Sequence, residues 1–148
     1  VEGLGVEAEA DWDNLRSPET YLGYARGDRK ASPDRHQLNE WGLVGEWTVG
    51  AENVSLDQAG GGIAYRFRAR DAHLVLSHAT DEPIPFRVLL DGDAPGRSHG
   101  VDVDENGNGV LGAGRLYQLV RQHDSVRERT LAISFLERGA EAYVFTFG

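Results

Sequence analysis

Apolar and polar side chains alternate in five segments of this chain, and this period of two limits the fold more than any other feature of the sequence. The positions that share one face of each segment are Ile63, Tyr65 and Phe67; Phe86, Val88 and Leu90; Leu116, Gln118 and Val120; Leu131, Ile133 and Phe135; and Tyr143, Phe145 and Phe147. Successive side chains of a β-strand point to opposite faces, so such segments are typical of strands with one buried face. The chain is therefore predicted to be built mainly from half-buried strands.

Residues that favour tight turns separate these segments. They are Gly60 to Gly62, Asp91-Gly92, Asn106-Gly107 and Gly139. About seven to ten short strands joined by such turns predict an all-β fold, an antiparallel β-sandwich or barrel, and we favour a sandwich of the jelly-roll type. Helical periodicity is confined to residues 8–16, where it is weak. A boundary near Ser17-Pro18 divides the chain into an acidic leader or linker, residues 1–16, and a β-sandwich module, residues 17–148.

The composition excludes several classes of function. The chain has 24 acidic and 15 basic residues and a net charge of -9, which repels nucleic acids and anionic lipid surfaces. It has no cysteine and no methionine, which excludes disulfides, thiolate zinc sites and dithiol redox chemistry within this chain. No apolar run is long enough to span a bilayer, and the N-terminus lacks the features of a signal peptide. We expect no nucleic-acid partner and no direct insertion of this fragment into a membrane.

One segment resembles the first half of a calcium-binding loop. Its oxygen-bearing residues are Asp102, Asp104 and Asn106. They precede Gly107, and alternate oxygen ligands before a sharp glycine turn are typical of such loops. The twelfth position of the loop would be Ala113, where calcium requires a bidentate glutamate. Valine and aspartate alternate over residues 101–104 as in a strand, so the sequence favours the tip of a hairpin over a calcium site.

No catalytic motif has the surroundings that it needs. Residues 96–100 match the Gly-x-Ser-x-Gly pattern of hydrolases, but that serine requires a helix after it and here another strand is predicted. The histidines show no spacing typical of a metal site. A jelly-roll glycoside hydrolase stays an alternative, and it would require two carboxylates about 5 to 9.5 Å apart. We expect the module to be non-catalytic and to need no cofactor.

Aromatic and arginine side chains are the remaining candidates for a binding site. A carbohydrate presents apolar C–H faces and a rim of hydroxyls, so its site needs flat rings together with hydrogen-bond donors and acceptors. The residues that we predict to bind a ligand are Tyr21, Tyr24, Arg26, Trp41, Arg115, Tyr117 and Arg121.

These residues also have structural interpretations. Tyr21 and Tyr24 are three apart, which on a strand places them on opposite faces, so one is expected in the core and the other outside. Trp47 is predicted to be in the core, and Trp41 to be more open.

The segment of residues 115–121 has two interpretations of equal weight. Arg115, Tyr117 and Arg121 share one face, which is polar enough to meet solvent and would offer a ring between two guanidinium groups. Alternatively, Tyr117 packs against a second sheet while the arginines lie over apolar surface or pair with acids.

Several ordered phrases of the sequence resemble a known protein family. They are SPETYLGYARGDR, LNEWGLVGEWTVG, AGGGIAYRFRARDAHLVL, HGVDVDENGNG with RLYQLVRQ, and EAYVFTFG. Together they resemble the C-terminal domain of DipZ-type thiol:disulfide interchange (cytochrome c biogenesis) proteins, over residues 12–148. In that family a membrane-embedded region is followed by an extracytoplasmic thioredoxin-like domain and then by a β-sandwich of the carbohydrate-binding-module type.

The resemblance implies a role and a location for the chain. The Cys-x-x-Cys pair would belong to the upstream thioredoxin-like domain, and a membrane-bound parent would hold this sandwich on the periplasmic or cell-wall side. By analogy the module binds a glycan, a peptidoglycan fragment or a glycosylated partner and keeps the redox domain near its substrates. The alternative is a structural domain that docks on its thioredoxin-like neighbour, or on a substrate protein, through exposed aromatic side chains.

Overall fold

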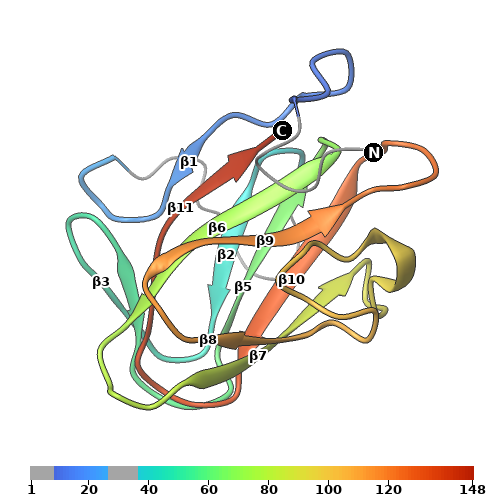
Figure 1. The fold of residues 1–148 in the computed structure, drawn as a ribbon. Helices are drawn as coiled ribbons and strands as arrows, with labels where there is room; N and C mark the ends of the chain where they lie inside the picture. Colours follow the sequence, from blue (N-terminus) through green and yellow to red (C-terminus); the bar gives the residue numbers. More distant parts are fainter. Residues whose placement is uncertain (1–8, 27–36) are drawn as a thin grey trace.

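The computed structural model describes residues 9–26 and 37–148, and these residues are almost entirely β-structure (Figure 1). They contain eleven strands and a 3-10 helix, η2, at Gly96–Ser98. The strands are β1 (Thr20–Tyr21), β2 (Trp41–Val44), β3 (Trp47–Val49), β4 (Val54–Leu56), β5 (Gly62–Phe67), β6 (Asp71–His78), β7 (Ile84–Leu90), β8 (Asn108–Leu111), β9 (Arg115–Arg121), β10 (Arg129–Phe135) and β11 (Ala140–Phe147). The predicted all-β fold is confirmed.

The strands form two antiparallel sheets that pack face to face (Figure 1). The six-stranded sheet has the order β3-β4-β11-β6-β9, with β1 also paired to β11. The five-stranded sheet has the order β2-β5-β10-β7-β8. From β5 onward the chain passes repeatedly between the two sheets, which is the connectivity of a jelly roll. The predicted antiparallel sandwich is therefore confirmed.

Aromatic rings from both sheets meet in the core between them. The ring centroids of Tyr65 in β5 and Phe145 in β11 are 4.9 Å apart, and Phe86 in β7 meets Tyr117 in β9 edge to face at 6.1 Å. The buried Tyr65 hydroxyl is 2.5 Å from the Thr20 hydroxyl, which satisfies its hydrogen bonding. In β5 and β7, side chains alternate between buried and more exposed as predicted.

A β-bulge changes the alternation in β9. Leu119 has no partner across from it in β6, so the strand carries one extra residue there. Tyr117 and Leu119 are buried in the core and Gln118 lies on the outer face. The interpretation that places Tyr117 on a solvent-facing side is therefore wrong. Of the flanking arginines, Arg115 reaches solvent at the start of the strand, whereas the Arg121 side chain at its end is 12% exposed and is bound to Asp71.

A second bulge lies in β11, where Tyr143 has no partner in β6. The simple alternation assigns Tyr143 to the same buried face as Phe145 and Phe147. In the structure Phe145 and Phe147 pack on the core, whereas Tyr143 is half-buried and lines a hollow at the surface. The extra residue turns this side chain away from the face that the period of two predicts.

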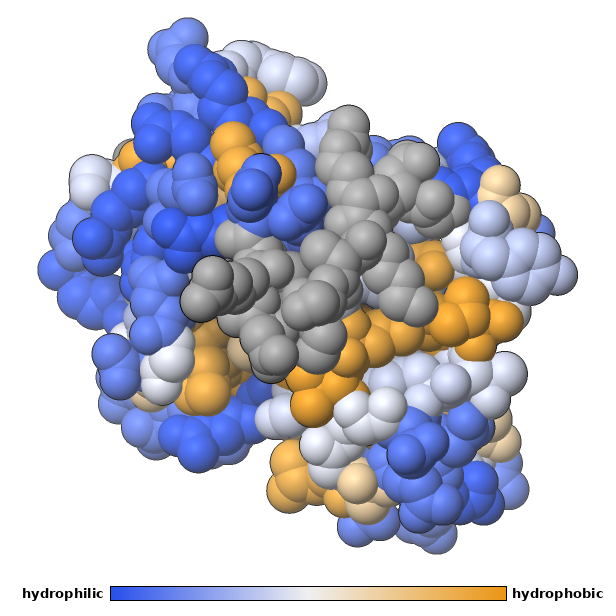
Figure 2. All heavy atoms as spheres, turned by 180° about the vertical axis from the view of Figure 1, so that it is seen from behind, coloured by the Kyte–Doolittle hydropathy of each residue, from blue (hydrophilic) through white to orange (hydrophobic). Residues whose placement is uncertain are grey.

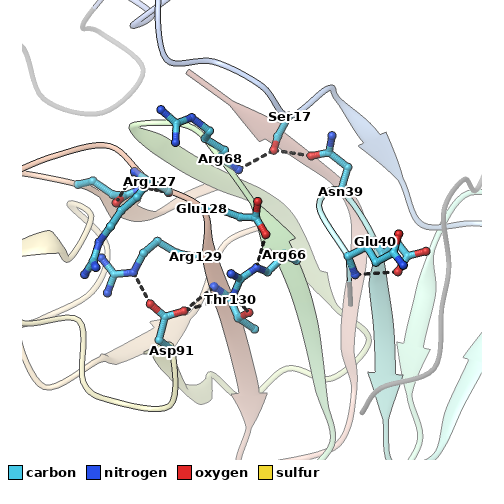
Figure 3. A network of polar contacts seen from close by, with 12 residues as sticks. Ser17, Asn39, Glu40, Arg66, Arg68, Asp91, Arg127, Glu128, Arg129 and Thr130 are labelled. Carbon is cyan, nitrogen blue, oxygen red and sulfur yellow. Dashed lines mark hydrogen bonds and ion pairs between the residues drawn. The ribbon is translucent and has the colours of Figure 1, made fainter. Parts of the chain in front are cut away.

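A two-residue turn at Asp91-Gly92 follows β7, as predicted. Both residues have positive φ angles, 51° and 87°, which the tightest hairpin turns require. The backbones of Leu90 and Asp93 exchange hydrogen bonds of 2.8 and 3.0 Å across the turn. The Asp91 carboxylate also accepts hydrogen bonds from Arg129 Nε at 2.5 Å and from the Thr130 N–H at 2.8 Å (Figure 3). This carboxylate therefore ties the turn to β10.

Residues 101–107 form turns and no strand, so the predicted strand at 101–104 is wrong. The Asp104 carboxylate accepts hydrogen bonds from the N–H groups of Asn106 and Asn108, at 3.0 and 2.9 Å. An aspartate that binds the backbone beyond it in this way closes its own turn. Gly107, with a φ of 92°, completes the turn directly before β8.

The weak helical periodicity of residues 8–16 does not produce a helix in residues 9–16, the part of this segment that the structure describes. The described part of this segment contains a turn in which the Asn14 N–H donates to the Asp11 carbonyl at 3.1 Å. The Arg16 N–H donates to the Arg68 carbonyl at 2.8 Å, which attaches the segment to the sandwich. In the part of the chain that the structure describes, no helix is long and apolar enough to cross a membrane.

Replacing Gly107 with alanine should destabilise the fold more than replacing Gly92. Both glycines have left-handed φ angles, so either change introduces about 1 kcal/mol of backbone strain. A Cβ at Gly107 would also lie 2.1 Å from the Val88 carbonyl oxygen, whereas a Cβ at Gly92 meets no atom within 4 Å. We expect urea unfolding to show about 2 kcal/mol more destabilisation for Gly107→Ala than for Gly92→Ala. Equal losses would mean that close packing at this turn contributes nothing.

Candidate functional site

The predicted binding residues are distributed over several places in the fold. Tyr21, Tyr24 and Arg26 lie together in and just after β1. The remaining predicted residues lie elsewhere in the fold, where other contacts hold them. They are Trp41, Arg115, Tyr117 and Arg121.

A surface hollow of about 270 Å³ adjoins β1, and we call it the Tyr21 hollow. Its walls come from β1 and the segment after it, from the turn between β3 and β4, and from β11. The side chains that give it chemical character are Tyr21, Arg26, Glu52, Tyr143 and Val144. Of the described residues that line it, Glu52 alone carries a carboxylate. The hollow therefore combines rings and aliphatic surface with one cation and one anion.

Arg26 lies over the ring of Tyr21. Its guanidinium carbon is 3.8 Å from the ring centroid, a cation–π arrangement that fixes the long side chain in place. The Tyr21 hydroxyl donates a hydrogen bond to the Glu19 carboxylate, and this bond raises the pKa of the Tyr21 phenol above its ordinary 10.0. Because Arg26 occupies one face of the ring, Tyr21 acts as a support that aims the guanidinium group.

Backbone contacts hold the segment after β1 against the turn between β3 and β4. The Tyr24 N–H donates to the Gly50 carbonyl at 2.9 Å, and the Ala25 N–H donates to the Ala51 carbonyl at 3.0 Å. Gly23 lies so close to the turn between β3 and β4 that an added Cβ would be 2.4 Å from the Ala51 carbonyl oxygen. The Tyr24 side chain is 70% exposed, and its neighbours Gly23 and Ala25 line the hollow, so a fixed backbone presents an exposed ring next to this lining segment.

Neither tyrosine of this segment is in the core, so the prediction that one of them would be buried is wrong. Tyr21 is half-buried and Tyr24 is exposed. The reason is that β1 has two residues only, and Tyr24 lies beyond it in a turn where strand alternation does not apply.

Tyr143 is a residue of the hollow that the sequence pattern does not identify. It belongs by parity to the buried side of β11, and only the bulge in this strand brings it to the surface hollow. A bulge leaves no signal in a single sequence, so Tyr143 could not have been selected.

Arg115 and Tyr117 support each other in a structural contact. The guanidinium carbon of Arg115 is 3.8 Å from the Tyr117 ring centroid, and its two terminal nitrogens bind the Asp102 carboxylate at 2.9 and 3.1 Å. The Tyr117 ring is 1% exposed, and its hydroxyl donates to the Ala113 carbonyl at 2.6 Å. The second interpretation of residues 115–121 is therefore supported at this end of β9, where the ring is buried and the arginine is paired.

Arg121 is held at the other end of β9 by a buried carboxylate. Its Nε and Nη2 atoms donate to the two oxygens of Asp71 at 2.7 and 2.8 Å. Arg70 binds the same carboxylate at 3.0 Å, and the Asp71 side chain is 3% exposed. Burial would raise the pKa of Asp71, but the hydrogen bonds from Arg121 and Arg70 outweigh burial and hold this pKa below its usual 3.8.

Trp41 is part of the core, contrary to the expectation that it would be open. It is 1% exposed and pairs across the strands with Tyr65. Because cross-strand partners share a face, the ring must follow Tyr65 into the sandwich. Trp47 packs on the core as predicted and lies edge to face with Phe135 at 6.2 Å.

The residues of the calcium-like segment bind other groups. The Asp102 carboxylate pairs with Arg115 and accepts the Gln118 N–H at 2.8 Å, and the Asp104 carboxylate binds the backbone of its own turn. Asn106 lies at the exposed tip of that turn. Among residues 9–26 and 37–148, no group of three or more histidine, aspartate or glutamate side chains is placed to hold a metal ion.

Comparisons with known proteins agree with this architecture. Residues 17–148 match the protein family described as thioredoxin like C-terminal domain. Among solved structures, a family two carbohydrate esterase from Clostridium thermocellum, in complex with cellohexaose, has a TM-score of 0.55 and 14% sequence identity to this chain. That match covers 73% of this chain and 31% of the esterase chain, so this chain spans less than a third of the esterase, and the likeness concerns the fold alone. No curated protein matches the sequence.

Replacing Asp71 with asparagine should lower the free energy of unfolding by about 2 to 3 kcal/mol, because two partly buried guanidinium groups lose their shared carboxylate. Urea unfolding at neutral pH measures this loss. Asp124→Asn is the control, since Asp124 pairs with Arg97 at 3.7 Å where the two side chains are 84% and 80% exposed. An exposed pair of this kind should give no measurable change. A loss as small for Asp71→Asn as for the control would contradict the role of the buried cluster.

The same carboxylate should make the fold less stable in acid. Because the pKa of Asp71 is below 3.8 in the folded state, the unfolded chain takes up this proton first as the pH falls. The stability that Asp71 contributes is therefore complete at a pH well above 3.8 and is lost as the pH falls through the folded-state pKa of Asp71. Thermal melting between about pH 5 and pH 2 should show a steeper loss for the natural chain than for Asp71→Asn. Parallel curves would show that Asp71 does not titrate on unfolding.

Proposed function

The chain belongs to the family of thioredoxin-like C-terminal domains, and we propose that it is a non-catalytic module that binds carbohydrate. It recognises a glycan, a peptidoglycan fragment or a glycosylated partner and holds an upstream thioredoxin-like domain of a DipZ-type parent near its substrates. Tethering raises the effective concentration of those substrates without new chemistry. The chain itself has no cysteine, so dithiol chemistry belongs to another part of such a parent, on the extracytoplasmic side of the membrane.

The Tyr21 hollow is the observation that carries this proposal. Tyr24 offers a free ring on which a sugar face can stack, and Arg26 offers a guanidinium group that is already aimed by Tyr21. Glu52 supplies an acceptor, while Tyr143 and the aliphatic lining exclude water from the C–H faces. The backbone hydrogen bonds of Tyr24 and Ala25 fix the site before a ligand arrives, which lowers the entropic cost of binding.

The hydrolase alternative receives no support from this hollow. Glycoside cleavage by the usual route requires two carboxylates across the scissile bond, and of the described lining residues only Glu52 supplies one. A ring, a guanidinium group and a single acidic side chain suit recognition of a sugar better than its cleavage.

A second candidate function, docking on the thioredoxin-like neighbour, rests on the outer face of the five-stranded sheet. Val44 is 50% exposed there, and the small side chains of Ala64 and Ala132 line a shallow hollow of about 200 Å³. Figure 2, which views the molecule from behind, shows an apolar area among hydrophilic surface. An apolar area of this kind suits a contact with another domain.

Arg26→Ala should weaken binding of cellohexaose or peptidoglycan fragments about tenfold or more, because charge-assisted hydrogen bonds to the ligand are lost. Tyr24→Ala should weaken it by a similar factor through loss of the stacking surface. A glycan array selects the ligand, and isothermal titration calorimetry then measures its affinity for each variant.

The matched control is Arg115→Ala. Arg115 also lies 3.8 Å from the centroid of a tyrosine ring, but its guanidinium group is bound to Asp102 and it is not part of the Tyr21 hollow. This variant should bind glycan like the natural chain. Absence of binding to any glycan, together with measurable affinity for the detached thioredoxin-like domain, would overturn carbohydrate recognition and favour the docking function.

A further inference from the structure

A second hollow, of about 380 Å³, lies on the outer side of β6 and β9, and we call it the His73 hollow. Its lining includes His73, Val101, Gln118 and His123. The loop on its far side is fixed, since the Gly100 N–H donates to the Leu119 carbonyl at 2.9 Å. The hollow is therefore preformed by a sheet face and a loop attached to that sheet.

Two residues that line this hollow each have a buried polar side-chain atom without a hydrogen-bond partner. In the described part of the chain they are the only side-chain atoms of this kind, His73 Nε2 and Gln118 Oε1. His73 is 5% exposed and lies directly opposite Gln118 across the two strands. Buried polar groups are nearly always paired, and an unpaired one is costly. Two such atoms on residues that face each other across β6 and β9, both lining one hollow, indicate that a partner binds there.

The chemistry of these atoms selects the partner. The other ring nitrogen of His73, Nδ1, is 3.2 Å from the Thr146 hydroxyl. If Nδ1 donates the proton of this hydrogen bond, Nε2 is an acceptor, and if the hydroxyl donates it, Nε2 is a donor. Gln118 Oε1 is an acceptor in either case. A hydroxyl both donates and accepts, so two neighbouring hydroxyls can pair with Nε2 and Oε1 in either state. A carboxylate cannot pair with Gln118 Oε1, because it has no proton to donate at neutral pH.

The charges around His73 do not favour an anion. Burial lowers the pKa of His73 below its ordinary 6.5, so the ring is neutral at pH 7. The nearest guanidinium group of the lining, Arg121, is bound to the Asp71 carboxylate. A neutral, hydroxyl-bearing ligand fits this balance of charge.

The Tyr21 hollow and the His73 hollow open on the same face of the six-stranded sheet. Tyr21, Val144, Val75 and Leu116 are successive cross-strand partners, which share one face. Thr146, His73 and Gln118 form the next row, two residues further along β11. Three strand spacings separate β1 from β9, which is about 14 Å.

We infer that the His73 hollow is a second carbohydrate subsite, which binds a vicinal diol of the same glycan chain that occupies the Tyr21 hollow. This inference rests on the proposed function, because it assigns the ligand of the second hollow to the same chemical class. A ligand long enough to cross β11 and β6 reaches both hollows. A disaccharide is shorter than this span and cannot reach both hollows, and we expect it in the Tyr21 hollow, to which the proposed function assigns the stacking contact.

The test compares cellohexaose with cellobiose, each measured by isothermal titration calorimetry on the full chain. The natural chain should bind the hexaose more tightly than the disaccharide. Gln118→Leu removes the unpaired acceptor and should weaken hexaose binding about tenfold. Cellobiose binding should not change in this variant. Unchanged hexaose affinity in Gln118→Leu would overturn the inference.

Gln58→Leu is the matched control, because it makes the same replacement in an exposed turn outside both hollows and should leave both affinities unchanged. Thermal melting checks that Gln118→Leu folds, and loss of an unpaired buried acceptor should leave its melting temperature equal or higher.

A second measurement keeps this inference separable from the proposed function. In ¹H–¹⁵N spectra of the natural chain, cellohexaose should shift the side-chain amide signals of Gln118 and the backbone signals of Tyr24 and Ala25. Shifts at Tyr24 without shifts at Gln118 would overturn the second subsite and leave the proposed function standing. Shifts at Gln118 alone would refute the role of the Tyr21 hollow. No shift at either place would refute both.

Discussion

Packing between the inner faces of the two sheets is the constraint on which the rest of the structure depends. The ring of Tyr65 lies within about 5 Å of both Phe145 and Phe147, and burial of such surface is the main favourable term in folding. This packing also decides which side chains remain outside. Tyr21 follows Thr20, whose hydroxyl binds Tyr65, and alternation therefore sends Tyr21 outward. The surface hollows are lined by side chains that this packing leaves outside the core.

The fold is largely predictable from the sequence because β5, β7 and β10 keep an uninterrupted period of two. In β5, β7 and β10 the buried positions coincide with the predicted faces. The Asp91-Gly92 turn is equally predictable, since its two positive φ angles require such residues. The polar network around that turn is not predictable from the sequence. Arg66 binds Glu128 at 2.7 Å and Thr130 at 2.9 Å (Figure 3), and these contacts join strands that are distant in the sequence.

The candidate site is less predictable, because parity fails where strands bulge or end. The extra residues Leu119 and Tyr143 change which side chains face outward, so Tyr117 is buried and Tyr143 lines a hollow. Residue type alone predicts a ligand site wherever a tyrosine has an arginine nearby, and this description fits both Tyr21 with Arg26 and Tyr117 with Arg115. Only the surroundings distinguish the two pairs. Arg115 is bound to Asp102, whereas Arg26 lines an open hollow.

The Tyr21 hollow is assembled from three stretches of chain that lie far apart in the sequence, around residues 21–26, 51–52 and 143–144. A ligand that contacts all three stretches would link the first and the last strands of the sandwich. Since β1 has only two residues, this edge of the sheet is held by few contacts of its own. A bound ligand would then stiffen the point where the polypeptide enters the sandwich. It would also restrict the orientation of the chain segment that precedes β1.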